Sequence, residues 1–215
     1  YWFGARSLGR VETLLWNLRA RFDAFPPSLD VLGHWAPMSP DTRRWICHWH
    51  LQLADPLYRA FAGRYLAERR TEGHGHVGHG LAVAWVARNG PAKWSMATRV
   101  ELAGRLLTAA KAAGLLASRR DPRPLATPAV PGEAIEYLLY LSRNVSFQGG
   151  LLDNPYLAST GLSGPALDER LRSLSGMEFR RQGSLLDFGW RFPDLRAWAK
   201  AHRSSEPKPL VEAGA

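Results

Sequence analysis

The sequence predicts a mainly α-helical protein in which short β-hairpins interrupt the helices. Apolar residues recur at three- and four-residue steps through much of the 215-residue chain, which is the period of amphipathic helices. A longer pattern occurs twice: a helix, a glycine, an apolar segment, an arginine pair, a second apolar segment and a helix. A helix pair followed by a hairpin is typical of a winged helix-turn-helix unit. The predicted fold is therefore a helical N-terminal region with one or two winged helix-turn-helix units that carry short β-hairpins.

The first predicted helix covers Ser7 to Phe25 and ends at Pro26-Pro27, because proline interrupts a helix. A turn or short helix follows from Ser28 to Trp35. The apolar residues of the first helix share one face. They are Leu8, Val11, Leu15, Leu18, Phe22 and Phe25.

The stretch SPDTRRWICHWHLQLADP contains the start of the next helix. Ser39 can cap it, Pro40 suits the first helical position and Asp41 complements the helix dipole. Asp55 caps a further helix that runs to Arg70. After it, the glycine-rich segment TEGHGHVGHG predicts a flexible connection. The apolar face of the first of these helices consists of Trp45, Ile46, Trp49 and Leu53.

The clearest helical pattern is WSMATRVELAGRLLTAAKAAG, which follows a shorter apolar helix broken at Asn89-Gly90-Pro91. Ser95 can cap this helix, or Thr98 can do so in a capping box with Glu101. Gly114 is placed to end it in a left-handed turn. The helix should therefore stop just before the first arginine-rich hairpin.

The first hairpin pairs residues 115–117 with residues 125–127 around an arginine-rich tip at 119–123, and a helix from Pro131 to Arg143 follows it. The second set begins with NPYLASTGLSGPALDERLRSLSG, which predicts a short helix and a second helix ending at Gly176. MEFRRQGSLLDFGWRF then forms a hairpin with Arg180, Arg181 and Gly183 at its tip, and Pro193 to His202 forms a closing helix.

These elements divide the chain into four parts. Residues 1–80 form a helical N-terminal domain and residues 81–144 a first winged-helix-like unit. Residues 145–203 form a second winged-helix-like unit, and residues 204–215 a loose, polar tail.

The composition favours an anionic partner. The chain has 28 basic and 19 acidic residues, a formal net charge of +9, and a pI near 10.3. Such a charge favours nucleic acid, an anionic membrane or an acidic protein, although an inert basic surface has the same composition. Cys47 is the single cysteine, so no intrachain disulfide can form. No apolar run approaches the roughly 20 residues of a membrane span, and we expect a cytoplasmic protein without a membrane partner.

Arginine at a hairpin tip suits phosphate binding, because guanidinium donates several hydrogen bonds to phosphate oxygens. We therefore predict double-stranded DNA as the partner, bound mainly through phosphates. Arg99, Arg105 and Lys111 do not form one narrow stripe on their helix, which weakens the prediction of base reading. The predicted DNA-binding residues are Lys93, Arg99, Arg105, Arg119, Arg120, Arg123, Arg170, Arg172, Arg180 and Arg181.

Protein docking is the alternative, because winged units also hold partner proteins and arginines occur at solvated tips. A metal-dependent nuclease is a distant third reading. The possible ligands do not fit the spacing of a closed zinc finger, and no P-loop or nucleophile elbow occurs. We predict no enzyme activity, no cofactor, no metal and no small-molecule substrate. The possible metal ligands are Cys47, His48, His50, His74, His76 and His79.

Residues 39–143 resemble the BrxA family, small subunits of the BREX systems that defend bacteria against phage. The stretches that carry the resemblance are SPDTRRWICHWHLQLADP, LYRAFAGRYL, WSMATRVELAGRLLTAAKAAGLLA and PAVPGEAIEYLLYLSR. The resemblance implies a mostly helical, non-catalytic protein that binds double-stranded DNA beside other subunits of a defence complex. The segment from Val145 to His202 departs from the smaller members of the family, which end near its start.

Overall fold

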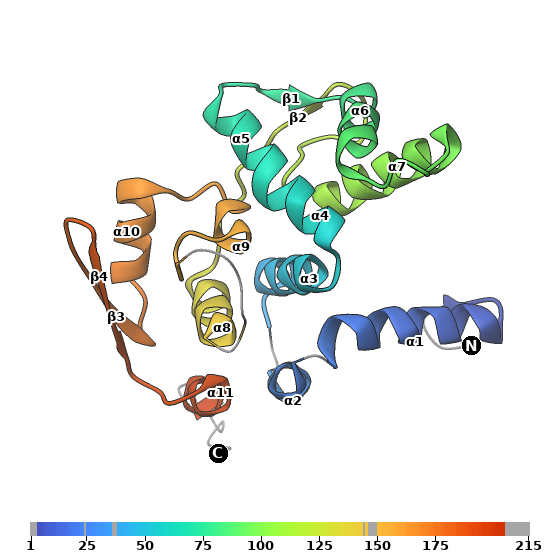
Figure 1. The fold of residues 1–215 in the computed structure, drawn as a ribbon. Helices are drawn as coiled ribbons and strands as arrows, with labels where there is room; N and C mark the ends of the chain where they lie inside the picture. The colour runs from blue at the N-terminus through green and yellow to red at the C-terminus, as the bar shows by residue number, and fades with distance from the viewer. Residues whose placement is uncertain (1–3, 24, 36–37, 144, 146–149, 205–215) are drawn as a thin grey trace, which may run out of the picture.

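The computed structural model describes residues 4–23, 25–35, 38–143, 145 and 150–204. Within them the chain is mainly helical and has two small antiparallel sheets of two strands each (Figure 1). The prediction of a mainly α-helical fold is therefore confirmed. The tail predicted from residue 204 lies, apart from Ser204, outside the described residues.

The elements follow one another along the chain with short connections. The N-terminal helices are α1 (Leu8–Phe22), α2 (Pro26–His34), α3 (Pro40–Ala54), α4 (Pro56–Ala60), the π-helix η2 (Phe61–Tyr65) and α5 (Leu66–Thr71). The middle elements are β1 (His76–Val77), α6 (His79–Asn89), α7 (Met96–Ala112), β2 (Arg123–Pro124) and α8 (Gly132–Ser142). The C-terminal elements are α9 (Pro155–Ala158), α10 (Gly164–Arg172), β3 (Met177–Gln182), β4 (Leu185–Trp190) and α11 (Leu195–Ser204).

Helix α1 ends at Phe22, three residues earlier than predicted, because Pro26 opens α2 at the first helical position. Of the six apolar residues predicted to share a face, Val11 is buried, whereas Leu8 is 60% exposed. Leu15 and Leu18 are exposed as well. The amphipathic pattern is present, but other described residues cover little of that face.

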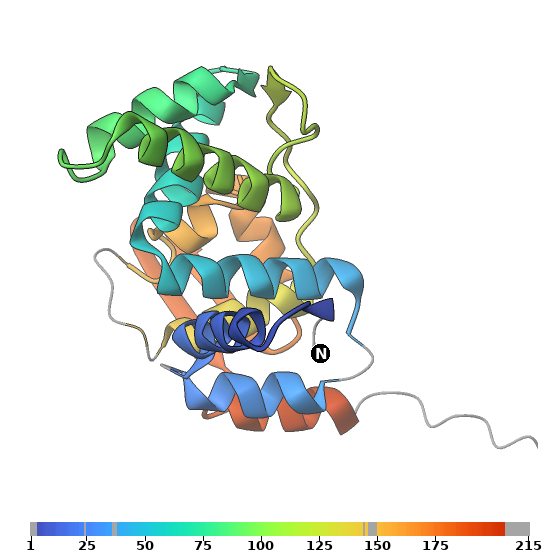
Figure 2. The same cartoon turned by 90° about the vertical axis from the view of Figure 1, so that its right-hand side faces the viewer.

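Helices α3 and α8 form the centre of the molecule. Figure 2 shows α3 between α7 on one side and α2 with α11 on the other. Trp45 and Trp49 of α3 are fully buried, and their indole nitrogens donate to the carbonyl oxygens of Ala129 (3.0 Å) and Tyr156 (3.1 Å). These bonds hold the chain segments around α8 and α9 against α3. Most residues of α8 are buried on all sides, as expected of an apolar helix inside a core.

The predicted helix from Asp55 to Arg70 consists of α4, η2 and α5 in one run. Asp55 caps it as expected, since its carboxylate accepts from the backbone nitrogens of Leu57 and Tyr58. The single π turn contains Gly63, which packs directly on Pro155 of α9. A π turn inside a helix rotates the residues after it relative to those before it. Here it lies at the contact with α9.

The glycine-rich segment 71–80 contains more structure than predicted. Its residues His76 and Val77 form β1, which pairs antiparallel with β2, and α6 already begins at His79. The pairing joins residues on both sides of the predicted boundary at residue 80. One core cluster also includes residues of α3, α4, α6, α7, α8 and α10. The division into domains stays a prediction.

The second hairpin is present, but its tip differs from the prediction. Arg181 lies opposite Leu186 and Gln182 opposite Leu185, so the turn consists of Gly183 and Ser184. Gly183 has a φ of +60°, which glycine adopts at little cost in a tight turn. Arg180 and Arg181 therefore belong to strand β3 and not to the tip. Among the described residues, no helix is long and apolar enough to cross a membrane.

Candidate nucleic-acid interface

Helix α7 and the segment after it form a single rigid corner. Ser95 caps α7 by accepting from the backbone nitrogen of Thr98, so Ser95 and not Thr98 is the capping residue. Gly114 (φ +81°) ends the helix, and the backbone nitrogens of Gly114 and Leu115 donate to the carbonyl oxygens of Lys111 and Ala110. This is the Schellman pattern of a helix C-terminus. It fixes the direction in which the chain leaves α7.

The first hairpin follows this corner and is shorter than predicted. Leu116 and Leu125 form an isolated antiparallel bridge, and Ala117 donates a backbone hydrogen bond to Pro124. The second arm of the hairpin also pairs with β1. Strand β2, which is part of this arm, is antiparallel to β1, and the backbone nitrogen of Leu125 donates to the carbonyl oxygen of Gly75. The arm that contains β2 therefore lies between β1 and residues 115–117. Three short segments hold the arginine-rich tip.

Two cations of this tip are free for a partner. The side chains of Arg119 and Arg120 are exposed and make no hydrogen bond or ion pair with other described residues. Arg123 is different, because its guanidinium donates to Asp121 at 2.8 Å and is 14% exposed. Asp121 also accepts from the backbone nitrogen of His79 at 2.6 Å, and these bonds lower the pKa of its carboxyl. Arg123 and Asp121 thus fasten the tip to α6.

The predicted cations on α7 have different surroundings. Lys93 is exposed in the turn before the helix, whereas Arg99 is half-buried and donates to the carbonyl oxygen of Ala92 at 3.0 Å. Arg105 is 71% exposed but pairs with Glu101. Lys111 donates to Ala117 at 3.0 Å and so braces the corner. These residues do not form one cationic stripe, as the sequence spacing indicated.

The outer face of α7 was not among the predicted site residues. Its exposed or half-exposed positions include small residues beside the larger Met96, Glu101 and Arg105; the small ones are Ala97, Val100, Gly104, Thr108 and Ala112. Small side chains let a helix approach another surface closely. The sequence signal for this face is the alternation of these residues with the buried positions Ala103, Leu106, Leu107 and Ala110.

The predicted cations near the second hairpin are mostly used within the protein. Arg181 forms an ion pair with Asp168 of α10 at 2.7 Å, and Arg170 donates to the carbonyl oxygen of Val130 at 2.6 Å. Arg180 is 73% exposed and lies 3.5 Å from Glu178. Arg172 is exposed and makes no side-chain hydrogen bond or ion pair with other described residues. Ion pairing reduces the charge that this hairpin offers to phosphate.

The start of strand β4, next to the second turn, exposes apolar side chains. Leu185 is 73% exposed and Leu186 is 38% exposed beside the turn. Solvated apolar side chains suit contact with a protein better than contact with phosphate. The two hairpins therefore present different chemistry: free arginines on the first and leucines on the second.

Two of the histidines considered as metal ligands, His48 and His50, are buried and have hydrogen-bond partners inside the core. His48 is buried between Tyr58 (2.9 Å) and Ser159 (2.9 Å), and His50 contacts Tyr137 at 2.7 Å. Burial lowers the pKa of His48 to about 3 and that of His50 to about 4. Among the described residues, no three His, Cys, Asp or Glu side chains gather in a way that could hold a metal ion.

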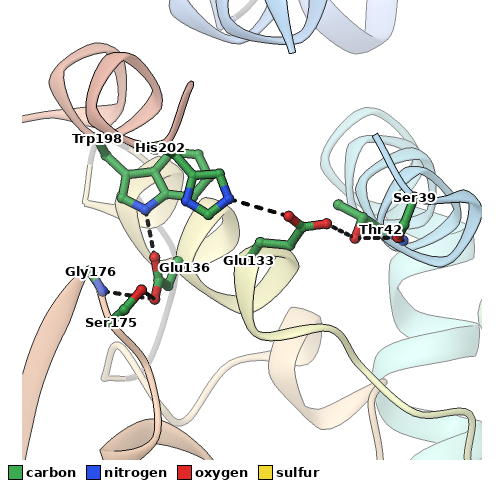
Figure 3. A network of polar contacts seen from close by, with 8 residues as sticks. All are labelled: Ser39, Thr42, Glu133, Glu136, Ser175, Gly176, Trp198 and His202. Carbon is green, nitrogen blue, oxygen red and sulfur yellow. Dashed lines mark hydrogen bonds and ion pairs between the residues drawn. The ribbon is translucent and has the colours of Figure 1, made fainter. Parts of the chain in front are cut away.

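A polar network around α8 has the residue types of an active site but not their arrangement. Figure 3 shows Glu133 between Thr42 and His202, and Glu136 facing Ser175, Gly176 and Trp198. The carboxylate of Glu133 stands between the hydroxyl and the imidazole, so the imidazole cannot take the hydroxyl proton as in a catalytic triad. The network instead ties α3 and α11 to α8.

Glu136 supplies the buried end of this network, and its replacement tests the structural role. Its carboxylate accepts from the indole of Trp198 at 2.6 Å and the backbone nitrogen of Gly176 at 2.8 Å. In Glu136→Gln an amide NH₂ replaces one carboxylate oxygen. It then faces either the indole N–H of Trp198 or the backbone N–H of Gly176, and one of these hydrogen bonds is lost. We expect a loss of about 1–3 kcal/mol in the free energy of unfolding, measured by urea denaturation. Exposed Glu12→Gln is the control, and equal stability of the two variants would contradict this role.

No family model, curated protein or solved structure matches this chain.

Proposed function

We propose that this protein binds double-stranded DNA through a winged helix-turn-helix unit that comprises α6, α7 and the strands around the 118–122 tip. The order of elements supports this proposal: a helical run, β1, two helices, and two chain segments that pair with each other, of which the second also pairs with β1. In such units the second helix enters the major groove, which is about 12 Å wide, and the hairpin lies near phosphates.

The observation that carries the proposal is the pair of free arginines at the tip. Arg119 and Arg120 are exposed and have no side-chain partner among the described residues, next to a loop that Asp121 fixes to α6. A positioned, uncompensated guanidinium pair suits two phosphates of one strand. The small residues on the outer face of α7 allow that part of the helix to approach the duplex, and the mixture of Glu101 and Arg105 beside them supports binding with little sequence preference.

The wider role is a non-catalytic, cytoplasmic accessory subunit of a bacterial anti-phage defence complex. This part of the proposal depends on the resemblance of residues 39–143 to the BrxA family. DNA binding through phosphates and the absence of a catalytic arrangement in the network of Figure 3 are compatible with such a role.

Reversing the charge of the first tip tests DNA binding. Wild-type protein should bind a random duplex with an affinity that falls steeply as the salt concentration rises. Each neutralised phosphate contributes about −0.9 to the slope of log affinity against log salt concentration. Arg119→Glu/Arg120→Glu should lower the salt slope by about 2 and the low-salt affinity by at least about 10-fold. Fluorescence anisotropy with a labelled duplex measures both quantities.

The control for this experiment is Arg6→Glu/Arg10→Glu, which changes the net charge equally at exposed residues on and before α1. If both double variants lose duplex affinity by the same factor, the loss comes from the change in net charge and not from the arginines of the tip. If wild-type protein does not bind at low salt, the isolated protein is not a DNA-binding protein.

Protein docking is the second candidate function, and the exposed apolar residues favour it. Trp16 is 69% exposed on α1, and Leu185 is 73% exposed at the second hairpin. Binding through such residues would persist at moderate salt, because burial of apolar surface is not screened by ions. Salt-resistant complexes that Leu185→Ser weakens, together with no duplex binding, would favour docking over DNA binding.

A further inference from the structure

A pocket of about 430 Å³ lies between α3 and the C-terminal end of α7, with the end of α1 at its rim. Both cartoon views place α3 between α7 and α1 (Figures 1 and 2). Its walls include Leu51, Ala109, Ala112 and Ala113, so most of the lining is apolar. The volume is within the range of pockets that hold small ligands, roughly 300–1,000 Å³. None of the predicted DNA-binding residues lines it.

Three arginines from two helices stand at this apolar pocket: Arg21 of α1, and Arg43 and Arg44 of α3. Arg21 makes no side-chain hydrogen bond or ion pair with other described residues, and Arg43 donates to one neutral carbonyl oxygen, that of Met38. Both lie near Cys47, where burial raises the pKa of the thiol and the two guanidiniums act against this rise. Two cations of the pocket are therefore uncompensated.

Arg44 is partly neutralised but still has an unused donor. It lies 3.2 Å from Asp41, while its Nε is buried and has no hydrogen-bond partner among the described residues. The three arginines and Asp41 together carry a formal charge of +2. The carbonyl oxygens of Ala110 and Lys111 at the end of α7 are already bonded by the Schellman turn and do not compete for these donors.

The ligand that fits has a doubly charged head and an apolar body. A phosphate monoester carries about −1.5 to −2 at pH 7, whereas a phosphodiester of DNA carries one charge. Guanidinium pairs bind phosphate oxygens bidentately. We propose that the pocket binds a phosphate monoester of about mononucleotide size, with its phosphate at Arg21, Arg43 and Arg44 and its body against Leu51 and the alanines of α7. This inference does not depend on the proposed DNA binding.

Isothermal titration with adenosine 5′-monophosphate, ribose 5-phosphate and inorganic phosphate tests the proposal. Wild-type protein should bind the nucleotide more tightly than ribose 5-phosphate and inorganic phosphate, because the nucleotide also fills the apolar part of the pocket. Arg21→Gln/Arg43→Gln should weaken binding of the nucleotide at least about 10-fold. Arg64→Gln/Arg88→Gln, at exposed residues outside the pocket, is the charge-matched control and should bind as the wild type does.

A second variant leaves every charge in place. Ala112→Phe places a large side chain in the apolar part of the pocket, at an exposed position. It should weaken binding of the nucleotide by a larger factor than binding of inorganic phosphate. Circular dichroism establishes that each variant is folded. The proposal is wrong if the wild type binds none of the three probes at low salt, or if the arginine control loses as much affinity as the pocket variant.

Duplex binding distinguishes this site from the proposed DNA interface. Arg21→Gln/Arg43→Gln should keep the duplex affinity of the charge-matched control, and Arg119→Glu/Arg120→Glu should keep the nucleotide affinity. If the pocket variant instead loses duplex binding as strongly as the tip variant, the pocket belongs to a DNA surface and the small-ligand proposal fails. Loss of duplex binding in the tip variant alone leaves both proposals standing.

Discussion

Replacing Gly63 by alanine should destabilise the protein strongly, because no space exists for a methyl group there. A Cβ at this position would overlap the carbonyl oxygen of Pro155 and lie 2.6 Å from its Cβ and 2.8 Å from its carbonyl carbon. The obstacle is mostly backbone, so η2 and α9 must move apart. Overpacking of this kind costs about 3 kcal/mol, which for a chain of this size lowers the melting temperature by roughly 6–12 °C.

The matched control for Gly63 is Gly104 in the interior of α7. A Cβ on Gly104 would meet nothing within 4 Å, and the backbone is helical. Gly104→Ala should therefore stabilise the protein by about 0.5–1 kcal/mol, because alanine has the higher helix propensity. Thermal denaturation of both variants by circular dichroism gives two shifts of opposite sign. Similar small shifts in both would show that η2 and α9 are not in close contact.

The contact between Gly63 and Pro155 also joins the N-terminal elements to the C-terminal elements. The run α4–η2–α5 packs with α6 and α7 in one core cluster, and Pro155 opens the C-terminal elements. A variant that separates η2 from α9 should still bind duplex DNA if the first hairpin acts alone.

The predictions that the structure confirms depend on residues close together in the sequence. Ser39, Asp55 and Gly114 act within four or five residues of themselves, as caps or as the left-handed end of a helix. Such signals are complete in a short window of sequence. The same holds for the second hairpin, whose arms are joined by the two residues Gly183 and Ser184.

Burial of the α1 face was not predictable from its periodicity. The pattern shows which residues share a face, but coverage of that face requires a second element, and Leu8 and Trp16 remain exposed. The roles of Arg181 and Arg170 were also not predictable, because their partners Asp168 and Val130 are distant in sequence. Asp168 lies 13 positions before Arg181, and His79 lies 42 positions before the Asp121 that pairs with Arg123.

The candidate ligand pocket shows the same limit more strongly. Arg43, Arg44 and Cys47 follow from one stretch of sequence, whereas Arg21 and the alanines of α7 join them only through packing of three helices. Alanines at a helix C-terminus read as ordinary helix formers in a sequence. Their position opposite an arginine pair gives them a role as an apolar wall.

Acidification should destabilise the protein below about pH 6.5 because of His48 and His50. Burial lowers their pKa values in the folded state to about 3 and about 4, from an ordinary value of 6.5. The unfolded chain therefore binds the two protons first, and stability is complete above about pH 6.5 and falls as the pH drops toward 4. Each histidine contributes about 1.4 kcal/mol per pH unit, so roughly 4 kcal/mol is lost between pH 7 and pH 5.

The hydrogen bonds explain why the two imidazoles stay neutral. The Gln52 amide nitrogen lies 2.6 Å from His48 Nε2 and can only donate, so Nε2 accepts and the ring proton is on Nδ1, which donates to the Tyr58 hydroxyl. His50 donates from Nδ1 to the carbonyl oxygen of Arg21, and its Nε2 accepts from the Tyr137 hydroxyl. A second proton would make both nitrogens of each ring donors. Nε2 of His48 would then face the Gln52 amide nitrogen, which is also a donor, and the Tyr137 hydroxyl could no longer donate to His50. The nearby charge of Arg70 further opposes protonation of His48.

Urea denaturation at half-unit steps from pH 7.5 to pH 4.5 measures this dependence. His48→Gln should be less stable than the wild type at pH 7, since a buried bond is lost, but its stability should fall about half as steeply with pH between 6 and 5. His34→Gln replaces a histidine whose side chain is 63% exposed and should leave the wild-type slope unchanged. A wild-type stability that is flat between pH 7 and pH 5 would show that these two histidines are not buried as neutral groups. In that case both imidazoles would be open to water, and α3 would not pack tightly against α4, α8 and α9.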